Sequence, residues 1–256
     1  MEKKSRGGRD RNIMVTQVNR REKGSIQMKM NRIVLGVLAV AGFLALALFR
    51  PMPSAAVSLL MVDNFEGPGG LKNTLDNRAS VFIKAPSKVM VSVQNGIIQG
   101  KKTQVLMIRY EKKQTGGPFN TGGWAGYYTL VKSAGAIAVP TPENPNPEPA
   151  KDKYLDASSY KALTFQVRGE TGKENFVIGL SDQHWDQVGD SVKSLEIGKY
   201  LPAGKLTTDW QKATIPFDEF FIDYTRLSAI SVVFEGDLFP AAGSAGKVYL
   251  DDIALE

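Results

Sequence analysis

The chain of 256 residues contains no cysteine and only one histidine, His184. Without cysteine there is no disulfide, no thiolate metal site and no cysteine nucleophile. A single histidine excludes a zinc site built from several histidines and would have to serve alone in a Ser-His-Asp mechanism. No G-x-S-x-G elbow and no glycine-rich phosphate-binding or dinucleotide-binding motif accompanies it. The sequence therefore argues against the common hydrolase and nucleotide-dependent enzyme classes.

Excess charge is also absent from most of the chain. Residues 1–56 hold 11 of the 32 Lys/Arg and 3 of the 26 Asp/Glu, which gives this segment a net charge of +8. Residues 57–256 carry the other 21 basic and 23 acidic residues, a net charge of −2. The basic arm, residues 1–32, has no interleaved aromatic residues, so we expect no nucleic-acid partner.

A basic arm followed by an apolar run is typical of a membrane-targeted chain. Residues 33–49 contain no charge and would span about 25 Å as a helix, which is short for a bilayer crossing. Small residues at 54–56 suit signal-peptidase cleavage. We expect residues 33–56 to form either a cleaved signal peptide, which we favour, or a single transmembrane anchor. Both alternatives place residues 57–256 in the periplasm or outside the cell.

Beyond residue 57 the pattern is of short, alternating segments, and Leu163–Val167 is a clear example. Such alternation predicts an all-β sandwich whose strands each have one buried face. Only 218–221 resembles a helical turn. The proline-rich stretch 133–153 cannot join a sheet interior, and we interpret it as a loop. The expected strands are 59–65, 80–84, 88–94, 104–111, 124–132, 162–168, 175–181, 211–216, 229–234 and 247–255.

Five motifs in order make the chain similar to carbohydrate-binding module family 11 and, more loosely, to the complex I intermediate-associated protein family. They are VDNFEGP (62–68), GGWAGYY (122–128), YLDASSYKALTFQVRGE (154–170), DWQKATIPFDEF (209–220) and KVYLDDIAL (247–255). The resemblance implies a β-jelly roll of galactose-binding-like topology. It also implies a polysaccharide ligand on the concave sheet and a structural calcium ion near the chain ends.

Four acidic residues are candidates for that calcium site. Asp63 and Glu66 lie at the first strand, and Asp251 and Asp252 lie in the last. Calcium takes six to eight oxygen ligands, which carboxylates and backbone carbonyls supply. The family likeness favours Glu66 and Asp251. The alternative is that these acids face water at the ends of the sheet.

The polar segment SDQHWDQVGD (181–190) is the first candidate for the ligand site. Sugar rings stack on aromatic faces, and their hydroxyls need polar partners. Trp185 stands there among Asp182, His184 and Asp186, which offer hydrogen-bond donors and acceptors. The alternative is that Trp185 covers the edge of the core.

Further groove candidates are Arg109, Tyr110 and Tyr127, which lie on other expected strands, and Tyr200, which lies between two of them. Adjacent residues of a strand point to opposite faces, so one of Tyr127 and Tyr128 must enter the core. Trp124 and Tyr128 share one face, and Tyr127 lies on the other.

Three functions follow from these patterns. The favoured hypothesis is non-catalytic binding of a polysaccharide in the cell envelope through an aromatic-lined groove. The second is a protein-interaction or assembly factor with an envelope partner. A glycoside hydrolase or lyase is the least favoured, although two facing carboxylates would be enough for glycoside hydrolysis.

Overall fold

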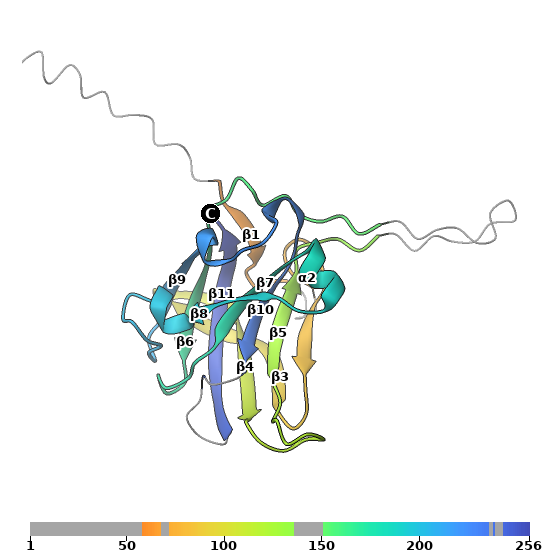
Figure 1. The fold of residues 1–256 in the computed structure, drawn as a ribbon. Helices are drawn as coiled ribbons and strands as arrows, with labels where there is room; N and C mark the ends of the chain where they lie inside the picture. Colours follow the sequence, from red (N-terminus) through yellow and green to blue (C-terminus); the bar gives the residue numbers. More distant parts are fainter. Residues whose placement is uncertain (1–57, 68–71, 136–150, 236–237, 239–242) are drawn as a thin grey trace, which may run out of the picture. The chain divides into compact units, whose positions relative to one another are not determined.

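The computed structural model describes residues 58–67, 72–135, 151–235, 238 and 243–256 (Figure 1). These residues form two antiparallel sheets with eleven strands, within one compact unit that begins at Ala56. The prediction of an all-β sandwich is confirmed. The expected export segment and most of the proline-rich stretch lie outside the described residues. No helix in the described part of the chain is both long and apolar enough to span a membrane.

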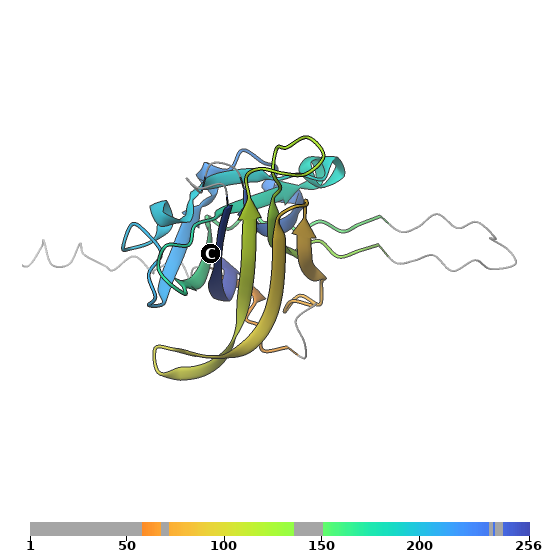
Figure 2. The same ribbon diagram turned by 90° about the horizontal axis from the view of Figure 1, so that it is seen from below.

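The larger sheet contains six strands. Five follow the order β3-β4-β11-β6-β9, and β1 pairs with β11. The β3–β4 hairpin curves away from the rest of the sheet (Figure 2). The strands of this sheet are β1 (Leu60–Asp63), β3 (Lys88–Ile98), β4 (Lys101–Lys113), β6 (Ala162–Gly169), β9 (Gln211–Pro216) and β11 (Gly243–Leu255).

The smaller sheet contains five strands in the order β2-β5-β10-β7-β8. Its central strand, β10, pairs with β5 on one side and β7 on the other. Its strands are β2 (Ala79–Ile83), β5 (Ala125–Leu130), β7 (Val177–Asp182), β8 (Val192–Glu196) and β10 (Leu227–Phe234).

One α-helix, α2 (Gln183–Val188), follows β7 directly. Asp182 caps its first turn by accepting a hydrogen bond from the Trp185 N–H, and Gly189 ends it in the left-handed conformation. The sequence pattern predicted neither this helix nor β8. The expected turn at 218–221 corresponds to the 3₁₀ helix η2 (Phe217–Glu219). The described residues also include the 3₁₀ helices η1 (Ile197–Tyr200) and η3 (Tyr224–Arg226).

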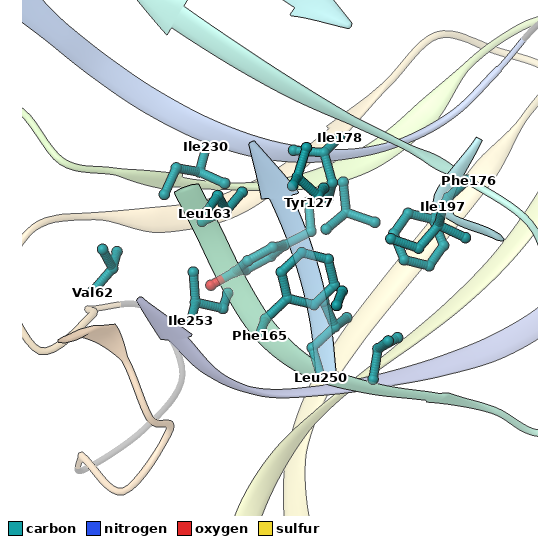
Figure 3. Close-up of a cluster of buried hydrophobic side chains, with 14 of the residues drawn as sticks. Val62, Tyr127, Leu163, Phe165, Phe176, Ile178, Ile197, Ile230, Leu250 and Ile253 are labelled. Atoms are coloured by element: carbon teal, nitrogen blue, oxygen red, sulfur yellow. The ribbon is translucent and has the colours of Figure 1, made fainter. Parts of the chain in front are cut away.

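The core lies between the two sheets. Leu163, Phe165 and Val167 of β6 point inward, as their alternation predicted. Tyr127 of β5 meets them from the opposite sheet, and Figure 3 shows its ring among Leu163, Phe165 and Ile253. Because Tyr127 faces inward, its neighbours Gly126 and Tyr128 face the outer side of the smaller sheet.

A change of partner strand divides β11. Residues 243–250 pair with β4, whereas 253–255 pair with β1. Asp251 and Asp252 stand at this junction, where the register also shifts against β6. Asp252 has a φ of 51° and the register shifts there, so the strand is bulged at this point. Asp251 is buried and Asp252 is exposed.

Candidate functional site

A groove of about 540 Å³ lies on the outer face of the five-stranded sheet. Its residues come from β2, β5, β10 and β7, and from the α2–β8 connection. The lining residues are Arg78, Phe82, Trp124, Tyr128, Leu130, Lys132, Ser181, Asp186, Gly189, Asp190, Ser191, Lys193, Ala229, Ser231, Val233 and Glu235.

Small side chains form the floor of this groove. Along one row across the sheet, Tyr128 is paired on one side with Ser80 and on the other with Ser231, and Ser231 is followed by Gly179. A Cβ at Gly179 would lie 2.5 Å from the Ser231 hydroxyl oxygen, so that position has no room for a larger residue. The Tyr128 ring therefore stands above a depressed surface.

Three aromatic side chains line one part of the groove. Tyr128 belongs to β5, Trp124 immediately precedes that strand, and Phe82 belongs to β2. The Trp124 and Phe82 rings are 5.6 Å apart at their centroids and are tilted by 58°. A Cβ at Gly126 would lie 2.3 Å from the Phe82 ring, so this glycine leaves room for that ring. Trp124 remains 39% exposed, which leaves part of the indole available to a ligand.

Ion pairs fix the charged side chains that form the polar walls of the groove. The Lys132 ammonium contacts Asp186 at 2.5 Å and Asp152 at 2.7 Å. Partial burial acts to lower the pKa of Lys132, but hydrogen bonds to Asp152 and Asp186 outweigh it and raise that pKa. On the β8 side, Lys193 contacts Asp190 at 3.1 Å. These pairs fix polar side chains in place, which suits the recognition of sugar hydroxyls.

Two smaller hollows adjoin this region. The first, here called the side basin, has a volume of about 490 Å³ and shares Trp124 and Glu235 with the groove. It lies against the turn after β2 and the loop between β4 and β5, since its residues are Lys84, Lys112, Gln114, Thr115, Thr121, Gly122, Gly123, Trp124 and Glu235. The second hollow, of about 310 Å³, lies beside α2.

The predicted residues of the 181–190 segment are divided among these hollows. Asp186 lines the groove. Asp182 and His184 line the hollow beside α2. The Asp182 carboxylate there accepts hydrogen bonds from the backbone N–H groups of Trp185 and Asp223. Trp185 is half-buried, stacks edge-on against His184 and lines none of the three hollows.

The other four predicted ligand residues lie away from the groove. Tyr110 is buried and stacks on Phe234 at 4.0 Å, and Tyr127 is buried in the core. Arg109 is exposed on the larger sheet, paired with Lys247. Tyr200 packs against the core, and its hydroxyl accepts a hydrogen bond from Leu195 N–H. Of these two adjacent tyrosines, Tyr128 therefore lines the groove and Tyr127 does not.

The sequence pattern placed Trp124 and Tyr128 on one face, although neither was among the predicted ligand residues. A usable signal was present in β10, where Ala229 and Ser231 alternate with the large apolar residues Ile230 and Val232. A strand whose outer positions are small and uncharged indicates a depressed surface rather than a solvated one.

The four predicted calcium ligands are not all brought together. Asp63 is buried in the sandwich, and Asp252 is exposed beyond the bulge. Glu66 and Asp251 do converge, because the Thr103 hydroxyl oxygen lies 2.7 Å from Glu66 and 2.9 Å from Asp251. Within the described residues no group of three or more His, Cys, Asp or Glu side chains is placed to hold a metal ion.

Within the described ranges no Lys, Arg or His side chain forms an ion pair with Glu66 or Asp251. A hydroxyl has one proton and can donate to only one of the two carboxylates at a time. Burial raises the pKa of Asp251 to about 6, and the nearby charges of Asp252 and Glu66 add to that rise. A cation would fit this arrangement, since two carboxylates and a hydroxyl oxygen are the ligand types that calcium takes.

Asp63 makes stability depend on pH. Burial raises the pKa of Asp63 to about 6, although a hydrogen bond from Phe65 N–H opposes the rise. Between pH 4 and 6 the unfolded chain loses this proton first, so the contribution of Asp63 to folding stability falls as pH rises, by up to about 3 kcal/mol. In urea unfolding, we expect Asp63→Asn to reduce the decline in the free energy of unfolding between pH 4 and 7 and to leave the part that Asp251 contributes. An unchanged slope would show that Asp63 is not its source.

Comparison with known proteins agrees with this fold. The described residues form a β-sandwich, and a groove with aromatic and polar lining lies on the outer face of its smaller sheet. Residues 148–256 match the family model of carbohydrate binding domain 30. The resemblance to carbohydrate-binding modules found in the sequence is therefore confirmed. No curated protein matches the chain.

Two solved structures of Clostridium thermocellum share the fold. The family 11 carbohydrate-binding module of the cellulosomal cellulase Lic26A-Cel5E is 16% identical, with a TM-score of 0.50 over 78% of this chain and 95% of that one. The family 11 module in complex with a beta-1,3-1,4-mixed-linked tetrasaccharide is also 16% identical, with a TM-score of 0.51 over 78% and 96%. At this identity the likeness establishes the fold alone.

Proposed function

We propose that residues 57–256 form a non-catalytic carbohydrate-binding module and that the groove on the five-stranded sheet holds the polysaccharide. The observation that carries this proposal is the exposed face of Trp124 beside Tyr128, above a floor of small residues and between walls of fixed ion pairs. Rigid aromatic rings provide a large contact area at a low entropic cost, and polar walls orient the hydroxyls.

The comparison supports a first choice of ligand class. A family 11 module of the same fold was solved with a mixed-linked tetrasaccharide. We infer that a soluble β-glucan of this kind is the first ligand to test. Trp124 and Tyr128 are four residues apart in an extended segment, which separates them by about 13 Å along the strand. A ligand that contacts both must therefore be longer than one sugar unit.

Affinity electrophoresis of the full chain in gels containing mixed-linkage β-glucan tests this function. We expect retardation that increases with the glucan concentration and is lost in gels without glucan. If no polysaccharide in a broad panel retards the chain, the groove does not serve as a glycan site. In that case the assembly-factor hypothesis, with an envelope protein as partner, becomes the preferred explanation. Release of reducing sugar from any of the panel would instead indicate a hydrolase.

We further propose that the junction of β1, β4 and β11 binds a structural calcium ion. Glu66, Asp251 and the Thr103 hydroxyl would supply ligands, and carbonyl oxygens or water would complete the shell. A bound cation would neutralise the two carboxylates and join the first and last strands of the described sandwich. The ion would thus stabilise the sandwich without acting on the polysaccharide.

Thermal unfolding with and without calcium tests that site. We expect calcium to raise the Tm by several degrees and equimolar magnesium to raise it much less, because magnesium demands a tighter octahedral shell. Glu66→Gln and Asp251→Asn should each remove the calcium effect, while Glu111→Gln on the same sheet should preserve it. A calcium shift that persists in Asp251→Asn would place the ion elsewhere.

The N-terminal segment supports a proposal about location. We propose that residues 33–56 export the domain and that the domain works in the periplasm or outside the cell. If the segment is cleaved the domain is released, and if the segment is retained the domain stays tethered to the membrane. The basic arm followed by an uncharged apolar run is the basis for this. External protease should digest the domain on intact spheroplasts. Full protection until the membrane is lysed would place the domain inside.

A further inference from the structure

The side basin begins where the groove ends. Both hollows are lined by Trp124 and Glu235. These two residues occupy adjacent positions at the end of the smaller sheet, because Glu235 follows Phe234, which pairs with Ala125. The other groove residues on β2, β5 and β10 lie within the strands, whereas the basin is formed mainly by the turn after β2 and the loop between β4 and β5. The two hollows are therefore neighbours along the strand direction.

Trp124 is shared by the two hollows and is 39% exposed. An indole is a stacking surface for a sugar ring, and this one has open space toward the groove and toward the basin. The two volumes are similar, at about 540 Å³ and about 490 Å³, so the basin has room for sugar units of its own. A chain that stacks on Trp124 can therefore continue into both hollows.

The loop that forms one wall of the basin is held by hydrogen bonds. The Gly122 N–H donates to the Gly116 carbonyl oxygen at 3.1 Å, and the Gly123 N–H donates to the Lys113 carbonyl oxygen at 2.9 Å. The Asn120 side-chain oxygen accepts a hydrogen bond from the Gly116 N–H at 2.8 Å. Gly122 has a φ of 70°, and a Cβ there would lie 2.4 Å from the Lys113 carbonyl oxygen, so only glycine fits. A wall fixed in this way needs little further ordering when a ligand binds.

The side chains of the basin offer hydrogen bonds that suit a neutral sugar. Thr115 and Thr121 come from opposite ends of the loop, and both are exposed. Each threonine hydroxyl can donate one hydrogen bond and accept others, as a sugar hydroxyl does. Lys84 is also exposed and lines the basin, and its backbone N–H donates to the Trp124 carbonyl oxygen at 2.7 Å. A few polar groups beside an aromatic ring are what orients a ligand in a binding site.

We propose that the side basin is a further part of the glycan site and holds the sugar units beyond Trp124. This inference rests on the proposed function and extends the same site. The ligand that fits it is a neutral β-glucan chain with units in the groove, one unit stacked on Trp124, and further units bound by the hydroxyls of Thr115 and Thr121. The module then prefers long chains to short ones, and the two hydroxyls carry most of that preference.

Isothermal titration of the full chain with two mixed-linked oligosaccharides, a tetrasaccharide and a hexasaccharide, measures this preference. We expect the wild type to bind the hexasaccharide about tenfold more tightly, because two further neutral hydrogen bonds contribute about threefold each. The double variant Thr115→Val, Thr121→Val keeps the shape of both side chains and removes their hydroxyls. In this variant the ratio of the two affinities should fall to about twofold or less.

Thr214→Val is the matched control, because Thr214 is an exposed threonine of β9 on the larger sheet. This variant should keep the wild-type ratio. Equal affinity of the wild type for both oligosaccharides overturns the inference and leaves the glycan-binding function intact. A wild-type ratio that survives the double variant also overturns it, since the additional binding registers of a longer chain would then explain the preference. Failure to bind either oligosaccharide counts against the proposed function itself.

Discussion

Replacement of Trp124 by alanine is expected to weaken β-glucan binding by about thirtyfold or more. Truncation of a central aromatic anchor costs 2 kcal/mol or more in binding sites of this type. Trp124 is 39% exposed and contacts Phe82, so the fold should tolerate the change with a small loss in Tm. Isothermal titration with a mixed-linked tetrasaccharide measures the affinity, and circular dichroism checks the fold.

Trp185→Ala is the matched control for that result. Trp185 belongs to α2 and lines none of the three hollows, although the sequence pattern favoured it as the ligand residue. We expect this variant to retain the wild-type affinity. If Trp185→Ala abolished binding and Trp124→Ala did not, the ligand would lie along α2, and the original interpretation of the 181–190 segment would be right.

The paired tyrosines of β5 should separate stability from binding. Tyr127 is 1% exposed in the core, so Tyr127→Ala should lower the free energy of unfolding by about 3–5 kcal/mol. Tyr128 lines the groove, so Tyr128→Ala should cost less than about 1 kcal/mol of stability and weaken β-glucan binding about tenfold.

Urea unfolding measures the stability of both variants. Calorimetric titration measures their affinity for β-glucan, at a temperature where Tyr127→Ala is still folded. Folded Tyr127→Ala should bind β-glucan with close to the wild-type affinity. The reverse pattern, with Tyr128→Ala unfolding early and Tyr127→Ala losing the ligand, would mean that β5 presents its other face to the groove.

Periodicity predicted the fold well. The alternation of apolar residues at Leu163, Phe165 and Val167 correctly predicted that β6 is a strand with an apolar inner face. The short strand β8 was not predicted, because Val192–Glu196 has only weak alternation and sits at a sheet edge. α2 was not predicted either, since its six residues are too few for a helical period, although the cap at Asp182 and Gly189 was present in the sequence.

The resemblance to carbohydrate-binding modules was more accessible from sequence than the location of the groove. The ordered motifs led to carbohydrate-binding modules, which the family model supports over residues 148–256. Strand parity separated Tyr127 from Tyr128, but parity cannot say which face is covered by the second sheet. That choice depends on the pairing of β5 with β2 and β10 and on what lies above each face, and these are long-range contacts.

The metal-ligand prediction shows the same limit. Glu66 and Asp251 are distant in sequence, and they meet only because β1 replaces β4 as the partner of β11 at that point. Asp252, at the bulge, is exposed and does not join them. A one-residue irregularity of this kind leaves no clear trace in the hydrophobic pattern, because the residues around it still alternate.

The three tryptophans of the chain make the central claim directly measurable. Trp124 lies in the groove, Trp185 on α2, and Trp210 packs against Tyr249 on the larger sheet. Two-dimensional ¹H–¹⁵N spectra recorded while a mixed-linked tetrasaccharide is added would follow each indole N–H. Progressive movement of the Trp124 signal, with the other two unchanged, is the result that a glycan-binding groove on the five-stranded sheet predicts. Movement of the Trp185 or Trp210 signal while Trp124 stays fixed would contradict it.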